Sequence, residues 1–332
     1  MIFEFDSDQR LWQETVRGIV AKRCPPTVIR EIVDKGTDSA PVWQAYIEHG
    51  WTALTDPENA VELAIVLEEL GRATDPTPYL ATMTQFAPLA PDFVHAGETG
   101  ATVYDGVLAR REGTRWRLNG TARQVLDGDR ADRLAVVTAA GVFVVPSTAV
   151  TAARTETFDP VSHLAEVSFE NVWVGDADRS PVQVRDARRL ALTGLALTMV
   201  GACQRILDLV LEQVRTRQQF GVPIGSFQAV KHKAADMHVA VERARALAYY
   251  AALTIAEQDP GRELAASMAK AAAGECQSLV FRHGVQLFGA MGFTWENDLQ
   301  FALKRAKFGE LLLGGAAVHR ALIAEEYRAT HL

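Results

Sequence analysis

The spacing of apolar residues changes twice along the chain, and this feature constrains the fold more than any other. Apolar side chains recur at helical spacing in residues 6–91, alternate in residues 104–174 where β-branched residues become common, and return to helical spacing after residue 186. The last segments are longer than most globular helices and predict an antiparallel bundle of four or five helices. The sequence therefore predicts a mainly α protein with a small central β domain.

Domain boundaries are expected where the spacing changes. We predict an N-terminal helical domain over residues 1–100, a β domain over 101–182 and a C-terminal helical bundle over 183–332. With 332 residues, 48% of them hydrophobic, the chain can bury a core large enough for two or three packed units.

Local signals place several helix ends. Asp6 or Ser7 is expected to cap the first helix. The apolar face formed by Leu63, Val66, Leu67 and Leu70 is expected to end at Gly71. Further breaks are expected at residues 259–261 and 314–315, where proline or paired glycines interrupt helical spacing.

Two turns are predicted inside the β-rich segment. Asn119-Gly120 lies between two strand-like runs and predicts a hairpin turn, because both residue types tolerate positive φ. A second turn is expected at residues 139–141, between two alternating runs, and residues 166–174 are expected to form a further strand.

Composition excludes several classes of function. The net charge of −7 argues against a broad nucleic-acid-binding surface, which needs clustered Lys and Arg. Cys24, Cys203 and Cys276 are widely spaced and predict buried, inert thiols in place of a disulfide framework or zinc site. The eight histidines lack metal-binding spacing, so His232, His238 and His319 are expected at surfaces or helix ends. The first residues do not read as a signal peptide and no uncharged apolar run reaches about 18 residues, so a cytoplasmic location without membrane contact is expected.

Two motifs after residue 210 are more specific. Residues 217–228 read Arg-Gln-Gln-Phe-Gly-Val-Pro-Ile-Gly-Ser-Phe-Gln, and residues 286–293 read Gln-Leu-Phe-Gly-Ala-Met-Gly-Phe. With these motifs the chain resembles the acyl-CoA dehydrogenases. Residues 66–72, 118–121 and 304–307 are also similar in sequence to the corresponding segments of that family, so the resemblance covers nearly the whole chain.

The resemblance implies FAD as cofactor, bound by both motifs across a subunit boundary, and therefore an oligomer. Arg217 offers fixed donors for the pyrophosphate, and Phe220 offers a face for a flat ring. Taken singly, each motif residue fits an ordinary role as a helix-end charge, core side chain or packing glycine. No GxGxxG follows a strand and no P-loop motif occurs. The implied cofactor contacts are Arg217, Gln219, Phe220, Phe227, Gln228, Gln286, Leu287, Phe288, Gly289, Ala290 and Gly292.

The sequence departs from the family at its catalytic base. Members remove the α-proton of an acyl thioester with a carboxylate whose basicity rises in a dry pocket. Register places Leu313 at the commoner position of this Glu and Arg188 at the second one. Glu310 and Asp186 lie near these positions and are possible displaced bases, so no catalytic residue is assigned. Glu275 is expected to be structural.

The flavin-ring pocket is also depleted. The family's Thr-Glu-Pro-Gly-Ala-Gly-Ser-Asp loop is missing before Asn119, and its Trp-Ile-Thr motif reads Gln-Val-Leu at residues 124–126. The chain thus resembles one half of a heteromeric acyl-CoA dehydrogenase, such as those of bacterial steroid side-chain degradation. A homologous partner chain, in an expected heterotetramer, would supply the Glu.

Three functional hypotheses remain open at this point. The first is a subunit that converts an acyl-CoA to a trans-2-enoyl-CoA and passes electrons to an electron-transfer flavoprotein. The second is a homomeric flavoenzyme with a displaced base such as Glu310. The third is a structural or regulatory subunit that has kept the fold and lost the chemistry.

Overall fold

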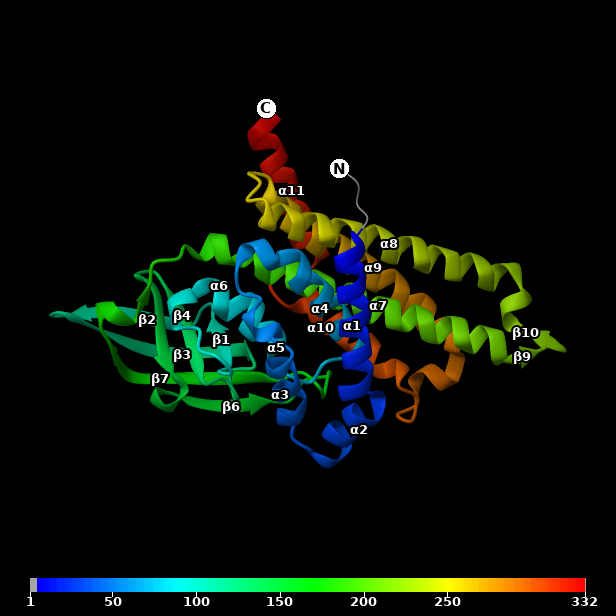
Figure 1. Ribbon diagram of the computed structural model, residues 1–332, viewed down its shortest axis with the longest axis horizontal. Coiled ribbons are helices and arrows are strands. Elements are labelled where there is room, and N and C mark those ends of the chain that lie inside the picture. Colours follow the sequence, from blue (N-terminus) through cyan, green and yellow to red (C-terminus); the bar gives the residue numbers. More distant parts are fainter. Residues whose placement is uncertain (1–4, 332) are drawn as a thin grey trace. The chain divides into compact units, whose positions relative to one another are not determined.

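The computed structural model describes residues 5–331 (Figure 1). Residue contacts group them into two compact units that alternate along the chain. The first unit contains residues 5–31, Pro57–Asp75 and 192–331, and the second contains Ile32–Asp56 and Pro76–Ala191. The division into three consecutive domains stays a prediction, whereas the mainly helical fold with a small β region is confirmed.

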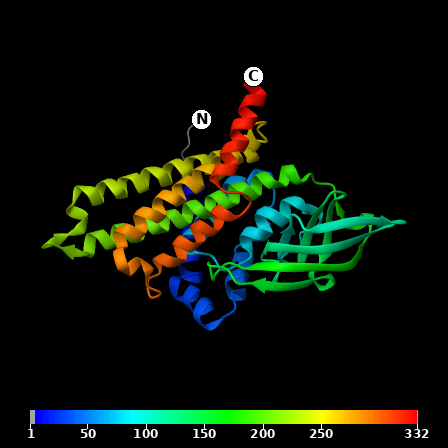
Figure 2. The ribbon, with the colours of Figure 1, turned by 180° about the vertical axis from the view of Figure 1, so that it is seen from behind.

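Long helices form the first unit, and two opposite views show α7, α8 and α9 running side by side (Figures 1 and 2). α8 packs closely on α9, and α4 packs on both α1 and α8. The helices of this unit are α1 (Ser7–Arg23), α4 (Ala60–Ala73), α7 (Val184–Thr216, in this unit from residue 192), α8 (Gln228–Ala256), α9 (Arg262–Phe288), α10 (Leu299–Leu311) and α11 (Ala316–His331), with the first turns of α2 (Pro26–Lys35) and the short helices η2 (Pro57–Asn59), η7 (Ile224–Ser226) and η8 (Gly289–Phe293).

Most of the predicted helix ends are confirmed. Asp6 caps α1: its carboxylate accepts bonds from the backbone N–H of Asp8 at 2.9 Å and of Gln9 at 2.8 Å. The interruptions between α8 and α9 and between α10 and α11 lie at the predicted breaks. The apolar residues of α4 and α7 that have helical spacing are buried, namely Leu63, Val66, Leu67, Leu70, Leu192, Leu195, Met199, Ile206 and Val210.

Gly71 does not end α4, contrary to the prediction, but lies inside it where α7 crosses. A Cβ added at Gly71 would lie 2.2 Å from the carbonyl oxygen of Thr198, and one at Gly201 would lie 2.0 Å from that of Glu68. α4 and α7 therefore approach each other backbone to backbone, and these two glycines are needed for close packing.

α7 is long and apolar enough to cross a membrane by length and composition alone. However, 83% of its most apolar window is buried inside the protein. Burial in a protein core accounts for this composition.

The second unit contains two four-stranded sheets. β1 (Gly100–Val103) runs parallel to β4 (Arg133–Thr138), which pairs with β5 (Gly141–Pro146), and β5 pairs with β8 (Arg179–Ser180). The other sheet is antiparallel, in the order β2 (Val107–Glu112), β3 (Arg115–Leu126), β7 (Leu164–Val174) and β6 (Thr151–Thr155). The turn at residues 139–141 and the strand at 166–174 are thus confirmed. The helical segments here are the end of α2, α3 (Ala40–Glu48), α5 (Tyr79–Ala81), η3 (Thr82–Phe86), α6 (Ala87–Leu89), the start of α7 and the short helices η1 (Trp51–Ala53), η4 (Pro91–Phe93), η5 (Ser147–Ala149) and η6 (Asp176–Asp178).

One core joins the two sheets, and another covers the outer face of the first. The shared core contains Leu118, Leu134, Phe143 and Val167, from strands of both sheets. On the other face of β4 and β5, a separate cluster joins Ala135 and Val144 to Phe86, Leu89 and Ala90 of the helical segment η3–α6.

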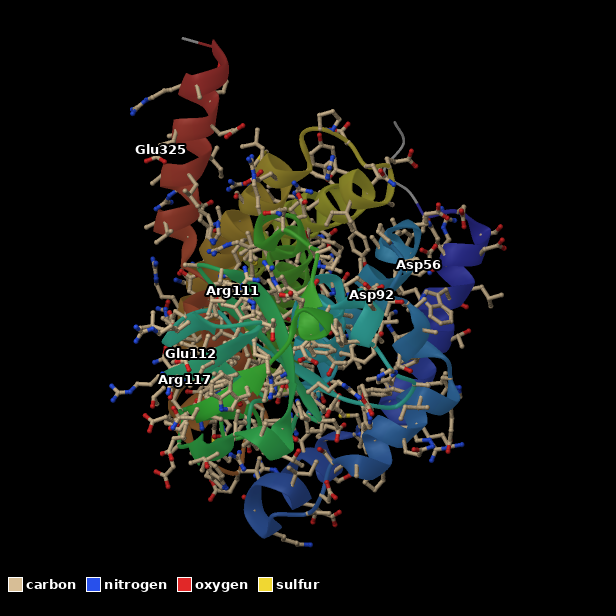
Figure 3. The ribbon with its side chains drawn as sticks, turned by 90° about the vertical axis from the view of Figure 1, so that its left-hand side faces the viewer. Asp56, Asp92, Arg111, Glu112, Arg117 and Glu325 are labelled. Carbon is tan, nitrogen blue, oxygen red and sulfur yellow. The ribbon has the colours of Figure 1, made fainter. Side chains whose placement is uncertain are left out.

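The hairpin predicted at Asn119-Gly120 is wrong, because both residues lie inside β3. β2 and β3 are joined at Gly113, where φ is +63°, and Arg117 forms an ion pair across this hairpin with Glu112 (Figure 3). The pairing of β3 with β7 shifts between Leu118 and Gly120, which marks a bulge. A Cβ added at Gly120 would lie 2.1 Å from the carbonyl oxygen of Gly106, so this glycine permits close strand approach.

The three cysteines are free and buried, as predicted. His232 and His238 are exposed, and His319 lies at a helix end, in the first turn of α11, where its side chain is buried. The described residues contain no cluster of His, Cys, Asp or Glu able to hold a metal ion.

Candidate functional site

Arg217 connects the two motifs. It follows the last residue of α7, and its Nη1 donates to the carbonyl oxygen of Phe288, at the end of α9, at 3.0 Å. The backbone carbonyl of Arg217 also accepts a bond from the N–H of Ile224 at 2.9 Å. The structure thus brings residues 217–228 and 286–292 together at one end of the first unit.

An exposed aromatic pair lies on the first motif. The short strands β9 (Gln218–Gln219) and β10 (Val222–Pro223) form a hairpin whose turn has positive φ at Phe220, +57°, and at Gly221, +81°. The Phe220 side chain is 91% exposed, and its ring meets that of Phe227 edge-on at 6.1 Å between centroids. Neither the protein core nor a neighbouring helix covers the Phe220 ring, so a ligand or another chain can stack on it.

The second motif forms the end of α9. Gly289 has φ +64°, and a Cβ added there would lie 3.4 Å from Nη1 of Arg217. Leu287 and Phe288 are buried, so only their backbone groups can face a ligand. Gln286 is exposed and accepts a hydrogen bond at 2.8 Å from Nζ of Lys233. Lys233 lies outside both motifs and was not among the residues predicted for the site.

Together these residues fit a ligand with a flat ring system and two phosphates, as FAD has. Two cations, Arg217 and Lys233, lie within the site, and the first residue of α8, Gln228, begins a helix whose terminal N–H groups favour anions. Gly289 leaves the backbone open beside Arg217. The exposed members of the predicted set are Gln219, Phe220, Phe227, Gln228, Gln286 and Ala290, whereas Gly292 is buried against Phe288.

The loop between α10 and α11 carries the position expected for the catalytic base. Leu313 lies there with φ +53°, followed by Gly314 with φ +95°. The carbonyl oxygen of Leu313 lies 3.1 Å from Nε2 of His319, and Lys270 Nζ donates to the carbonyl oxygens of Glu310 at 3.2 Å and Gly314 at 2.8 Å. Buried polar groups thus fix the loop from two sides, with an aliphatic side chain at the base position.

Lys270 is the most unusual ionisable group near this loop. Its side chain is fully buried in α9, and desolvation lowers its pKa to about 8, while the Glu310 carboxylate opposes that shift and Lys307 adds to it. The role of Lys270, which lies among alanines in α9, could not be predicted from the sequence, because the carbonyl groups that it contacts lie 40 and 44 residues away along the chain.

The two carboxylates considered as displaced bases, Glu310 and Asp186, make structural contacts. Glu310 Oε1 accepts the backbone N–H of Ala316, the first residue of α11, at 3.0 Å. Glu310 Oε2 is buried without a hydrogen-bond partner among the described residues. Asp186 pairs with Arg189 at 2.6 Å.

Glu275 lies on the surface of α9, between two arginines. Its carboxylate pairs with Arg243 at 3.1 Å and with Arg320 at 2.8 Å. These contacts join α8, α9 and α11 and agree with the structural role expected for Glu275.

The chain is similar to known proteins over most of its length. A family model described as "Acyl-CoA dehydrogenase, C-terminal domain" matches residues 189–327. The chain is 32% identical to "Acyl-CoA dehydrogenase IpdE2" of Mycobacterium tuberculosis, over 92% of this chain and 93% of that protein.

Two solved structures have the same fold. A chain of the ChsE4-ChsE5 complex from Mycobacterium tuberculosis matches with a TM-score of 0.88 and 25% identity, over 99% of both chains. A structure described as the Tcur3481-Tcur3483 steroid ACAD G363A variant matches with a TM-score of 0.85 and 23% identity, over 97% of this chain and 98% of that one. The second likeness is one of fold alone.

Proposed function

Because the chain belongs to the acyl-CoA dehydrogenase family, we propose that it is one subunit of a heteromeric dehydrogenase whose partner chain supplies the catalytic base. The family consists of FAD-dependent flavoenzymes acting on CH–CH bonds, and FAD is the cofactor. When bound, FAD accepts the hydride from the β-carbon of the acyl thioester.

The observation that carries the proposal is the aliphatic residue at the expected base position. Leu313 cannot accept a proton, yet the loop that holds it is fixed by Lys270 and His319. A loop that is held in place but lacks a carboxylate is consistent with a subunit that keeps the fold while its partner takes the α-proton.

Arg217 and its neighbours then serve as the cofactor-binding part of this subunit. The guanidinium binds the pyrophosphate, Phe220 stacks on a flat ring of the cofactor, and Gln228 and Gln286 bind its polar groups. The open position of Phe220 favours FAD held jointly with a neighbouring subunit.

The finer parts of the proposal concern substrate, acceptor and assembly. The reaction is α,β-dehydrogenation of an acyl-CoA, with a steroid side chain as the favoured acyl group and an electron-transfer flavoprotein as acceptor. The likeness to one chain of a two-protein complex and to a steroid ACAD supports a heterotetramer of homologous subunits. We place the assembly in the cytoplasm.

The first test is the visible absorption spectrum of the purified chain, alone and co-expressed with a homologous candidate partner. Steroid and fatty acyl-CoAs are then added without oxygen. We expect flavin absorption that is bleached by an acyl-CoA only in the co-purified pair.

Bleaching in the lone chain would refute the heteromeric proposal and favour a displaced base, for which the buried, unpartnered Oε2 of Glu310 is the specific indication. Glu310→Gln would then abolish turnover with flavin retained. If no assembly binds flavin, the chain is a structural subunit and the proposal fails.

A further inference from the structure

A cavity in the first unit lies apart from both cofactor motifs. It is half open to the surface, is lined mainly by residues of α1, α2, α4, α7 and α10, and has a volume of about 310 Å³, at the lower end of the range for small-molecule sites. None of its lining residues belongs to residues 217–228 or 286–292. Much of the lining is apolar, including Val20, Ile29, Ala73, Phe301 and Ala302.

Charged groups also line the cavity, and most of them are paired. Arg17 donates to Glu69 at 2.7 Å, Arg72 pairs with Asp208 at 2.6 Å, and Asp298 pairs with Arg30 at 2.8 Å. Each of these pairs balances its own charge.

Arg205 is the exception. This half-buried residue of α7 lines the cavity and makes no hydrogen bond or ion pair with another described residue. A guanidinium beside an apolar wall that has no anionic partner among the described residues is free to pair with the anionic group of a ligand. The cavity therefore presents one uncompensated positive charge and an apolar wall.

We propose that this cavity binds a small organic monocarboxylate with an apolar body, whose carboxylate pairs with Arg205. The planar guanidinium matches a carboxylate with two parallel bonds, and the apolar body covers Val20, Ala73 and Phe301. A multiply charged phosphate is disfavoured, because the carboxylates of Glu69 and Asp298 line the same cavity.

Binding at this site is non-covalent. Cys24 also lines the cavity, but its side chain is only 2% exposed, and burial raises the pKa of its thiol well above the usual range. A thiol that stays protonated is a poor nucleophile.

The test is calorimetric titration of the purified protein, in its assembled form, with decanoate, the neutral decanol and inorganic phosphate. Decanoate is expected to bind saturably and more tightly than decanol, and phosphate is expected not to compete. Arg205→Gln should raise the Kd for decanoate about tenfold or more, the loss expected for a charge-assisted bond. Arg205→Lys should have a smaller effect.

Arg215→Gln is the matched control. Arg215 lies on the same helix, is exposed, lines no part of the cavity and has no partner among the described residues. Its substitution should leave the Kd unchanged. Ala73→Leu, which fills the cavity, should abolish binding.

Three results would overturn the proposal: no saturable binding of decanoate, equal affinity for decanol, or wild-type affinity in both Arg205→Gln and Ala73→Leu. Arg205→Gln removes an unpaired charge, so its melting temperature should not fall. No CoA thioester or flavin reduction enters the measurement, so its outcome is independent of the dehydrogenase test.

Discussion

Replacement of Arg217 by alanine provides a direct test of the proposed FAD site. The guanidinium of Arg217 carries five N–H donors, and one of them, on Nη1, donates to the carbonyl oxygen of Phe288 at 3.0 Å. The remaining donors are available for the pyrophosphate. A hydrogen bond to a charged group contributes about 1.5–3 kcal/mol, so Arg217→Ala should weaken FAD binding roughly 10- to 150-fold.

The assay is the Kd for FAD of the deflavinated assembly, together with the flavin content of the protein as purified. Arg215→Ala is the matched control, two residues earlier at the exposed end of α7, and should bind FAD as the wild type does. Arg217→Lys keeps the charge but loses the planar guanidinium, so its Kd for FAD should lie between those of the wild type and Arg217→Ala.

Stability must be separated from binding in this experiment. The lost bond to the Phe288 carbonyl oxygen is a single hydrogen bond from a charged donor, worth about 1.5–3 kcal/mol, so Arg217→Ala should remain folded. A folded Arg217→Ala protein whose Kd for FAD equals that of Arg215→Ala would refute the assignment of this arginine to the pyrophosphate.

Three further predictions concern stability, each measured by urea unfolding. Arg245→Ala should lower the free energy of unfolding by about 3–5 kcal/mol, because it leaves the carboxylate of Glu68, which is 5% exposed, without the guanidinium that lies 2.8 Å away. Arg243→Ala, which removes an exposed ion pair with Glu275, should lower it by at most about 1 kcal/mol. Gly71→Ala should cost about 1–3 kcal/mol, because its methyl group would lie 2.2 Å from the α7 backbone. The pKa of Lys270 is about 8 in the folded protein against an ordinary 10.5, so between these pH values the unfolded chain binds more protons than the folded one. The free energy of unfolding of the wild type, relative to that of Lys270→Met, should therefore rise by about 3 kcal/mol as the pH rises from 8 to 10.5. This gain should be lost again as the pH falls.

Features set by a few neighbouring residues could be read from the sequence. Asp6 caps α1 because its carboxylate reaches N–H groups only two and three residues away. The turn at residues 139–141 and the break at residues 259–261 also depend on local backbone preferences. The fold could therefore be predicted in outline.

Glycines were misread where their role depends on a distant segment. Gly71 and Gly120 have the sequence surroundings of a helix end and a hairpin turn. In the structure, both permit close approach of another backbone, from Thr198 and Gly106 respectively. A sequence pattern cannot distinguish a glycine that ends an element from one that another element touches, because the touching residue is not part of the pattern.

The same limit explains what the sequence revealed about the site and what it did not. Register against the acyl-CoA dehydrogenase pattern predicts Leu313 at the base position, because the matching run at residues 304–315 is continuous along the chain. The groups that fix the loop, Lys270 and His319, contact backbone carbonyls and leave no mark on the residue types around them. In the described residues, these contacts hold a loop without an ionisable side chain at its base position, and a buried lysine with a pKa near 8 supports it at the cost of desolvation. If the loop served no function, replacing Lys270 by an apolar residue would remove that cost, so we infer that the protein needs the shape of this loop although the loop itself cannot remove a proton.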